Sequence, residues 1–323
     1  MAVRDKLKTG TVPDIAKLQA HPPSVIADGV RAAERASSGA DQSIAGRMKH
    51  SIADTGASKA AKNNDLQTAA ERSMQQRRLT TWQKIDDWNK FVFRAQSDNG
   101  ATNAYKLSNS REMLPILLRW LPARPGVLAK NEVAAYRVDA MLGFGRVPPT
   151  AIIHGPEGPG SVQQWVFSTK GLPYNEYPIL HQEQMAILDY IIANSDRSQL
   201  NYRTDRDGGI VAIDHQLSFP EKPGSDHGID SDFVKAFVAD PSRRFSDEVM
   251  RSVNAIDTNE LRKSLLDVGL SRKAVQGALD RLSEIRAHGT ITGEAWPGKI
   301  SGTPTYWPDQ MSQAQSLDDE WWR

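Results

Sequence analysis

Residues 188–219 read LDYIIANSDRSQLNYRTDRDGGIVAIDHQLSF and are the most informative stretch of the chain. In this stretch Asp207-Gly208 stands between two extended segments, and a two-residue Asp-Gly loop favours a type I′ hairpin turn. With that turn Asn201 lies opposite Asp214, and Asp196 lies just upstream, after an apolar segment of helical character. Two carboxylates and an amide oxygen at the mouth of a hairpin predict a hard-oxygen site, which suits Mg²⁺ carrying a nucleotide phosphate.

Composition limits the class of protein. The chain has 323 residues, of which 24% are charged and 39% hydrophobic, and its net charge of +1 gives no argument for nucleic-acid binding. The absence of cysteine excludes disulfides, thiolate nucleophiles and cysteine-ligated zinc. No apolar run approaches the roughly 20 residues of a transmembrane helix, and a secretory signal is not evident. We expect a cytoplasmic protein from a bacterial or bacteriophage source, with export without a cleaved signal left open.

Residues 1–81 differ from the rest of the chain. They contain no Phe, Trp or Tyr, and they carry 13 Lys and Arg against 8 Asp and Glu, whereas the remainder carries 27 against 31. Without aromatic residues such a segment buries little apolar area. We therefore expect a basic N-terminal arm that is helical or flexible. It is either a solvated segment or a signal that binds a partner or a delivery or assembly machinery.

From Trp82 onward the sequence predicts a compact α+β unit. Strands come first and helices follow, with the hard-oxygen site between them, which is typical of a two-lobed α+β domain. The tail at 291–323 is rich in Trp and Pro, and we expect it to pack on the body as an extended strap. Strands are predicted at 91–95, 103–107, 150–154 and 161–167, and helices at 126–142, 183–193, 232–239, 246–255, 258–268 and 271–287.

Four segments within residues 82–287 occur in a distinctive order. They are AYKL at 104–107, NEVAAYRVDAMLGFGRVPPT at 131–150, GPGSVQQWVF at 158–167, and DYIIANSDRSQLN and AIDHQLSF within 189–219. Together they resemble the bacterial branch of the phosphatidylinositol 3-/4-kinase-like family, which is atypical within the protein-kinase-like superfamily, and they are also similar to actin-fragmin kinase. The resemblance implies a small β-rich N-lobe over 82–167 and a mainly helical C-lobe over 168–290.

The resemblance implies that the N-lobe binds ATP. Lys106 matches the strand lysine that contacts the nucleotide phosphates, and Glu132 matches the helix glutamate that pairs with this lysine. Trp165, Val166 and Phe167 match the segment leading into the hinge between the lobes. Backbone groups there would bind the adenine edge, and apolar side chains would cover the ring.

The same resemblance assigns the catalytic loop. Asp196 matches the aspartate that accepts a hydrogen bond from the acceptor hydroxyl, and Arg197 would brace the loop. Asn201 and Asp214 match the metal ligands. Ser198 stands where the lipid-kinase pattern has histidine, and a hydroxyl cannot carry a positive charge.

Two further features bear on activity. The turn at 96–102, which would cover the phosphates, has Gly100 as its one glycine. His215 follows Asp214 and is a candidate to supply the missing imidazole. The sequence therefore predicts an ATP- and Mg²⁺-dependent phosphotransferase that acts on an unidentified protein or small-molecule hydroxyl. The alternative functions are a nucleotide-binding pseudokinase that serves as scaffold or regulator and a kinase-like fold that performs adenylyl transfer. A further alternative is that residues 196, 201 and 214 are ordinary polar turn residues without a role in a site.

Overall fold

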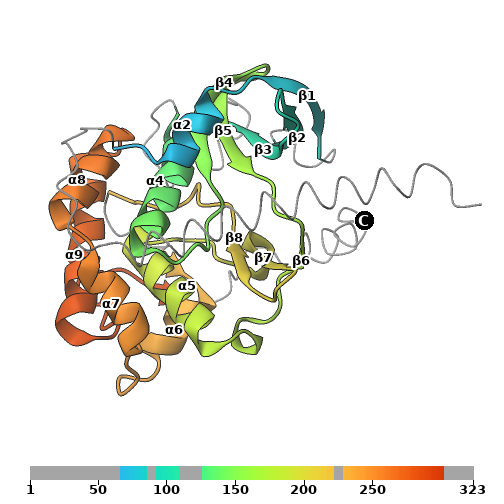
Figure 1. The fold of residues 1–323 in the computed structure, drawn as a ribbon. Coiled ribbons are helices and arrows are strands. Elements are labelled where there is room, and N and C mark those ends of the chain that lie inside the picture. The colour runs from blue at the N-terminus through green and yellow to red at the C-terminus, as the bar shows by residue number, and fades with distance from the viewer. Residues whose placement is uncertain (1–65, 86–91, 109–125, 222–227, 302–323) are drawn as a thin grey trace, which may run out of the picture. The chain divides into compact units, whose positions relative to one another are not determined.

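The computed structural model describes residues 66–85, 92–108, 126–221 and 228–301, which form a β-rich lobe and a mainly helical lobe (Figure 1). The expected two-lobed α+β fold class is confirmed. Residues 1–65 of the expected arm and the tail from residue 302 lie outside the described residues.

The β-rich lobe is built on one antiparallel sheet with the strand order β1-β2-β3-β5-β4. A short helix, α2 (Ala69–Gln75), precedes it, and Met74 of this helix packs against Ala151 and Val162 of the sheet. Helix α2 and the first residues of β1 precede Trp82, where the sequence predicted the compact unit to begin. The strands are β1 (Leu79–Lys84), β2 (Val92–Ser97), β3 (Thr102–Leu107), β4 (Thr150–Gly155) and β5 (Gly158–Gln164).

Helix α4 (Val127–Leu142) lies between the sheet and the helical lobe (Figure 1). It contacts β4 and β5 on one side and α5 and α8 on the other, so most of its circumference is buried. The helix ends at Gly143, whose φ of 69° is the left-handed conformation that closes many helices. The predicted helix and its predicted stop are both present.

The helical lobe follows the expected order. Asp257 caps α8 by accepting the backbone N–H groups of Asn259 and Glu260, and Ser271 caps α9 by accepting that of Ala274. These caps begin the helices where the sequence placed them. The helices are α5 (Ile179–Ile192), α6 (Asp232–Val238), α7 (Asp247–Ala255), α8 (Thr258–Asp267) and α9 (Arg272–His288).

A small antiparallel sheet, β6 (Ser168–Lys170), β7 (Tyr202–Asp205) and β8 (Ile210–Ala212), carries the predicted hairpin. The predicted two-residue type I′ turn is wrong by one position, because Tyr202 pairs with Ala212. Only Gly208 of the loop has a positive φ, 78°. Three residues, 206–208, therefore lie between Asp205 and Gly209, which bond across the hairpin, and Asn201 bonds with Ile213 instead of facing Asp214.

The cause of this shift is the side chain of Asp205. Its Oδ1 accepts the backbone N–H groups of Asp207 at 2.9 Å and Gly209 at 2.6 Å. These two bonds hold the chain in a turn with a single left-handed residue, so that Asp207 keeps an ordinary negative φ.

The tail returns to the body as far as residue 301. Trp296 is buried, and β10 (Ile300–Ser301) pairs in parallel with β9 (Ile229–Asp230). The strap expected from the sequence therefore packs on the helical lobe over these residues. Trp307, Trp321 and Trp322 lie outside the described part of the chain.

Candidate active site

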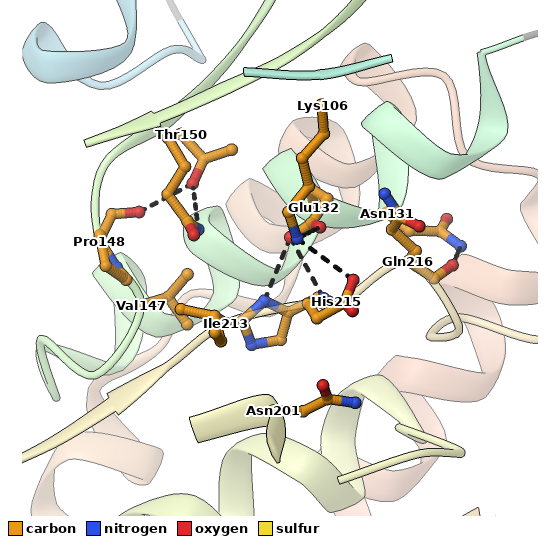
Figure 2. Close-up of polar contacts among 12 residues, drawn as sticks. Lys106, Asn131, Glu132, Val147, Pro148, Thr150, Asn201, Ile213, His215 and Gln216 are labelled. Carbon is orange, nitrogen blue, oxygen red and sulfur yellow. Dashed lines mark hydrogen bonds and ion pairs between the residues drawn. The ribbon is translucent and has the colours of Figure 1, made fainter. Parts of the chain in front are cut away.

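Lys106 is the centre of the candidate site. It lies on β3, and its Nζ is 2.6 Å from Glu132 Oε1 on α4 and 3.2 Å from Asp214 Oδ1, just after β8 (Figure 2). The ion pair expected between Lys106 and Glu132 is thus present. One ammonium group joins the sheet, helix α4 and the segment that follows the hairpin.

Helix α4 also holds the segment after Asp214. Glu132 Oε2 accepts the backbone N–H of His215 at 3.2 Å, and the amide of Asn131 donates to the carbonyl oxygen of Gln216 at 2.7 Å (Figure 2). The same amide donates to the carbonyl oxygen of Ser218 at 2.8 Å. Two adjacent helix residues therefore attach this segment to the β-rich lobe. The sequence did not single out Asn131.

The charges at this centre stabilise one another. Burial opposes the charged form of Lys106, but Asp214 and Glu132 raise its pKa above the usual value. Burial likewise opposes the charge of Glu132, whereas Lys106 and His215 lower the pKa of this carboxyl below its ordinary value. Both groups are therefore ionised at neutral pH.

His215 lies on the inner side of this centre and faces away from solvent. Its side chain is fully buried, and Nδ1 lies 3.4 Å from Glu132 Oε2. Burial, followed by the charge of Arg197, lowers the pKa of this imidazole. In this position the ring contacts Glu132 rather than solvent. The suggestion that His215 supplies an imidazole to the reaction stays a prediction.

The loop that carries Asp196 is held by Arg197, whose guanidinium is fully buried. Its Nε donates to both carboxylate oxygens of Asp189 at 3.1 and 3.2 Å. Its Nη1 donates to the carbonyl oxygens of Asn201 and Ile213, the latter at 2.7 Å. The expected bracing by Arg197 is present, and Asp189 is a partner that the sequence did not reveal.

Asn201 and Asp214 are brought together by the backbone. Ile213 donates its N–H to the carbonyl oxygen of Asn201 at 3.1 Å, which places the residue before Asp214 against the 3₁₀ turn η3 (Gln199–Asn201). The amide nitrogen of Asn201 donates to the carbonyl oxygen of Asp196 at 2.6 Å. The three residues expected at the hairpin mouth therefore converge, although through a different register.

Asp196 carries an unsatisfied oxygen. Its Oδ1 is buried and has no hydrogen-bond partner among the described residues. Burial, followed by repulsion from Asp214, raises the pKa of this carboxyl well above its usual range. A carboxylate oxygen that has no protein partner and binds a proton readily is suited to accept a hydrogen bond from a hydroxyl group.

Residues 165–167 connect β5 to β6 and so join the two lobes. Trp165 donates its backbone N–H to Thr102 at 3.1 Å, and the carbonyl oxygen of Val166 accepts from the Ser168 hydroxyl at 3.1 Å. Phe167 is exposed, with the Arg206 guanidinium 5.3 Å from its ring centroid. The segment has the position expected of a hinge, and its adenine contacts stay a prediction.

Ser198 also belongs to this loop. It donates its N–H to Asp196 O at 2.7 Å and accepts the N–H of Asn201 at 2.9 Å through its own carbonyl oxygen. These backbone bonds close the loop between the two side chains. Ser198 is thus held within the loop by its backbone.

The described residues hold no group of three or more His, Cys, Asp or Glu side chains with the arrangement of a metal site. The metal ligands predicted from the sequence are fewer, namely one amide, Asn201, and one carboxylate, Asp214. None of the helices in the described ranges is both long and apolar enough to cross a bilayer.

Comparisons with known proteins give partial matches. No protein-family model matches the chain. It is similar to phosphatidylinositol 4-kinase gamma 4 of Oryza sativa subsp. japonica, with 33% identity over 121 residues, covering 31% of this chain and 21% of the relative. It is also similar to protein Rv2133c of Mycobacterium tuberculosis, with 28% identity over 130 residues, covering 28% of this chain and 47% of the relative. The chain therefore spans less than half the length of these two curated relatives.

Three solved structures are distantly similar to this chain. The structure of hydra Fam20 with sugar has a TM-score of 0.46 and 12% identity, covering 71% of this chain and 91% of that chain. The Golgi casein kinase with Mn/ADP bound has a TM-score of 0.45 and 13% identity, covering 70% and 75%. The Helicobacter pylori proinflammatory kinase CtkA has a TM-score of 0.40 and 12% identity, covering 69% and 95%.

Proposed function

We propose that this protein is an atypical kinase, which uses ATP and Mg²⁺ to phosphorylate a hydroxyl group of a protein or small molecule. The observation that carries the proposal is the contact of Lys106 with both Glu132 and Asp214. It places a fixed cation beside a carboxylate that is 40% exposed, at the junction of the two lobes. A buried lysine that is paired in this way can bind phosphate oxygens without first being ordered.

The acceptor side of the reaction is assigned to Asp196. In phosphoryl transfer the acceptor hydroxyl oxygen forms a bond to the γ-phosphorus, the bond from that phosphorus to the β,γ-bridging oxygen breaks, and ADP leaves. Asp196 Oδ1 would accept the hydroxyl hydrogen bond and take the proton. Its raised pKa favours that transfer, and the buried Arg197 keeps the loop in place.

The donor set fits a hard divalent cation. Asn201 contributes an amide oxygen and Asp214 a carboxylate, and both are ligands that Mg²⁺ accepts. The Asn201 amide nitrogen is already bonded to Asp196 O, which leaves its oxygen to face the site. When bound, the cation would supply positive charge against the triphosphate. Trp165, Val166 and Phe167 are proposed to contact the adenine.

A second function, nucleotide binding without phosphoryl transfer, is favoured by one observation. Ser198 cannot carry the charge of an imidazole, and His215 is fully buried beside Glu132. The described site therefore has no solvent-exposed imidazole at position 198 or 215. This would leave a pseudokinase acting as scaffold or regulator. Adenylyl transfer by the same site is distinguished by the mass that an acceptor gains.

The experiment is intact-mass spectrometry of the protein after incubation with ATP and Mg²⁺, together with a thermal shift on adding the nucleotide. Asp196→Ala should abolish phosphate addition and keep the thermal shift, whereas Asp214→Ala should abolish both. Asp207→Ala, an exposed change in the hairpin loop, is the control and should behave as wild type. A shift without added phosphate, also with hydroxyl acceptors present, would favour the pseudokinase. The absence of any shift would contradict the nucleotide site.

A further inference from the structure

Helix α4 carries a buried ion cluster away from the site. Arg137 donates through Nε and Nη2 to the two carboxylate oxygens of Glu71 on α2, at 2.9 and 2.7 Å. Its Nη1 donates to Ser264 O and Asp267 Oδ2 of α8, both at 2.9 Å. Arg137 is 2% exposed and Glu71 is 1% exposed. One guanidinium therefore connects α4 to a helix upstream of the sheet and to a helix of the other lobe.

A second contact joins α2 and α4 at the neighbouring residue. The hydroxyl groups of Thr68 and Tyr136 lie 2.9 Å apart. Thr68 also caps α2, because its Oγ1 accepts the backbone N–H of Glu71 at 3.0 Å. The cap thus fixes the first turn of α2, which carries Glu71. A two-pronged guanidinium–carboxylate pair is planar and directional, so it sets orientation as well as distance.

The cluster and the site lie on different sides of the same helix. Glu132 and Arg137 are five residues apart, which separates them by about 140° around the helix axis and about 7.5 Å along it. A turn or slide of α4 that breaks one set of contacts must therefore move the other. The ion pair of Glu132 with Lys106 and the bonds of Asn131 to Gln216 and Ser218 all depend on the same helix position.

We propose that Glu71 and Arg137 are positioning residues for nucleotide binding. They hold α4 at the rotation and height where Glu132 meets Lys106, although neither residue touches the nucleotide site. This inference rests on the proposed function. It assigns a functional task to α2, a segment that the sequence placed in a loosely attached arm.

The test is the affinity of the full chain for Mg²⁺-ATP, measured calorimetrically well below the unfolding temperature. Glu71→Gln keeps the shape of the side chain and removes its charge, and it should weaken binding about tenfold. Asp267→Asn changes a side chain that is 44% exposed and should give a smaller loss in the same direction. Gln75→Ala, an exposed change on the same helix, should leave the affinity unchanged.

Measuring Glu71→Gln in a second genetic background, the Glu132→Gln variant, distinguishes a positioning role of Glu71 from a purely structural one. In Glu132→Gln protein the pair with Lys106 is already weakened, so Glu71→Gln should add no further loss of affinity. Equal losses in both backgrounds, or unchanged affinity in a folded Glu71→Gln and Asp267→Asn protein, would overturn the positioning role alone. A wild-type chain without affinity for Mg²⁺-ATP would overturn the proposed function, and this inference with it.

Discussion

Asp214 has an unusual backbone conformation at the point where metal binding is proposed. Its φ is 57°, in the left-handed region that aspartate visits more readily than most residues with a β-carbon. The residues that follow are held by Glu132 and Asn131 through three hydrogen bonds to their backbone. Strained residues persist where surrounding contacts determine them, and here those contacts come from α4. The carboxylate is thereby aimed at Lys106.

Asp139 gives a pH-dependent prediction at the scale of one residue. Burial raises its pKa to about 6, although the backbone N–H groups of Val147 and Arg146 partly stabilise its charge. The folded state thus binds this proton more tightly than the unfolded chain does. The stability contributed by Asp139 is complete below about pH 3.8 and is lost as the pH rises through 6. Asp139→Asn should remove this dependence.

The measurement is urea denaturation of wild type and Asp139→Asn between pH 4 and 7. The difference in unfolding free energy should change by up to about 3 kcal/mol, with wild type gaining relative to the variant as the pH falls. Asp207→Asn, an exposed change in the hairpin loop, should run parallel to wild type. A constant difference between wild type and Asp139→Asn would refute a raised pKa.

Among the elements, helices were predicted better than strands. Helices α8 and α9 begin at Asp257 and Ser271 because these caps act through local hydrogen bonds that the sequence displays. Strand β1 was missed because it lies at the sheet edge, and its mostly exposed residues lack the alternation that marks a half-buried strand. The hairpin register was wrong because the Asp205 carboxylate selected a three-residue loop.

Two glycines test how the elements place Lys106. A β-carbon on Gly160 would lie 2.0 Å from the carbonyl oxygen of Lys106, so Gly160→Ala must push β5 away from β3. Gly208 has open space around it and a φ of 78°, so Gly208→Ala costs only backbone strain. We expect a loss of about 1 kcal/mol for Gly208→Ala and of about 3 kcal/mol for Gly160→Ala.

The two glycine variants should also differ in their affinity for Mg²⁺-ATP. Gly160→Ala should weaken this affinity, because the strand that carries Lys106 moves, whereas Gly208→Ala should leave it unchanged. Denaturation and nucleotide titration of both variants provide the data. Equal affinities in two folded variants would show that the position of β3 does not control the site.

At the scale of the whole molecule, contacts between distant segments limit what the sequence could predict. The pairing of Lys106 with Glu132 was expected because the resemblance supplied it. The bonds of Arg197 to Asp189 and of Arg137 to Glu71 were not expected, since they depend on how helices pack. A buried charge needs a partner, but the sequence does not show which distant residue provides it. The roles assigned to the site residues stay predictions until nucleotide binding is measured.

The attachment of the tail provides the last prediction. Glu284 on α9 is buried, and its carboxylate also accepts the Tyr190 hydroxyl at 2.6 Å. Glu284→Ala leaves the first turn of the tail without its acceptor, so we expect a loss of about 2 kcal/mol in urea denaturation. The tail groups that donate to this carboxylate are the backbone N–H groups of Thr292, Gly293 and Ala295, at 2.7, 2.9 and 2.6 Å.

The matched control is Glu294→Ala, which removes an exposed carboxylate from the same tail and should change stability little. The pH dependence has the opposite sign to that of Asp139. Burial opposes the charge of Glu284, but the hydrogen bonds from Tyr190 and the tail lower its pKa. Its contribution is therefore present above about pH 4.5 and is lost as the pH falls through the lowered pKa. If Glu284→Ala and Glu294→Ala unfold at the same urea concentration, the tail is held by Trp296 and the pairing of β10 with β9 instead.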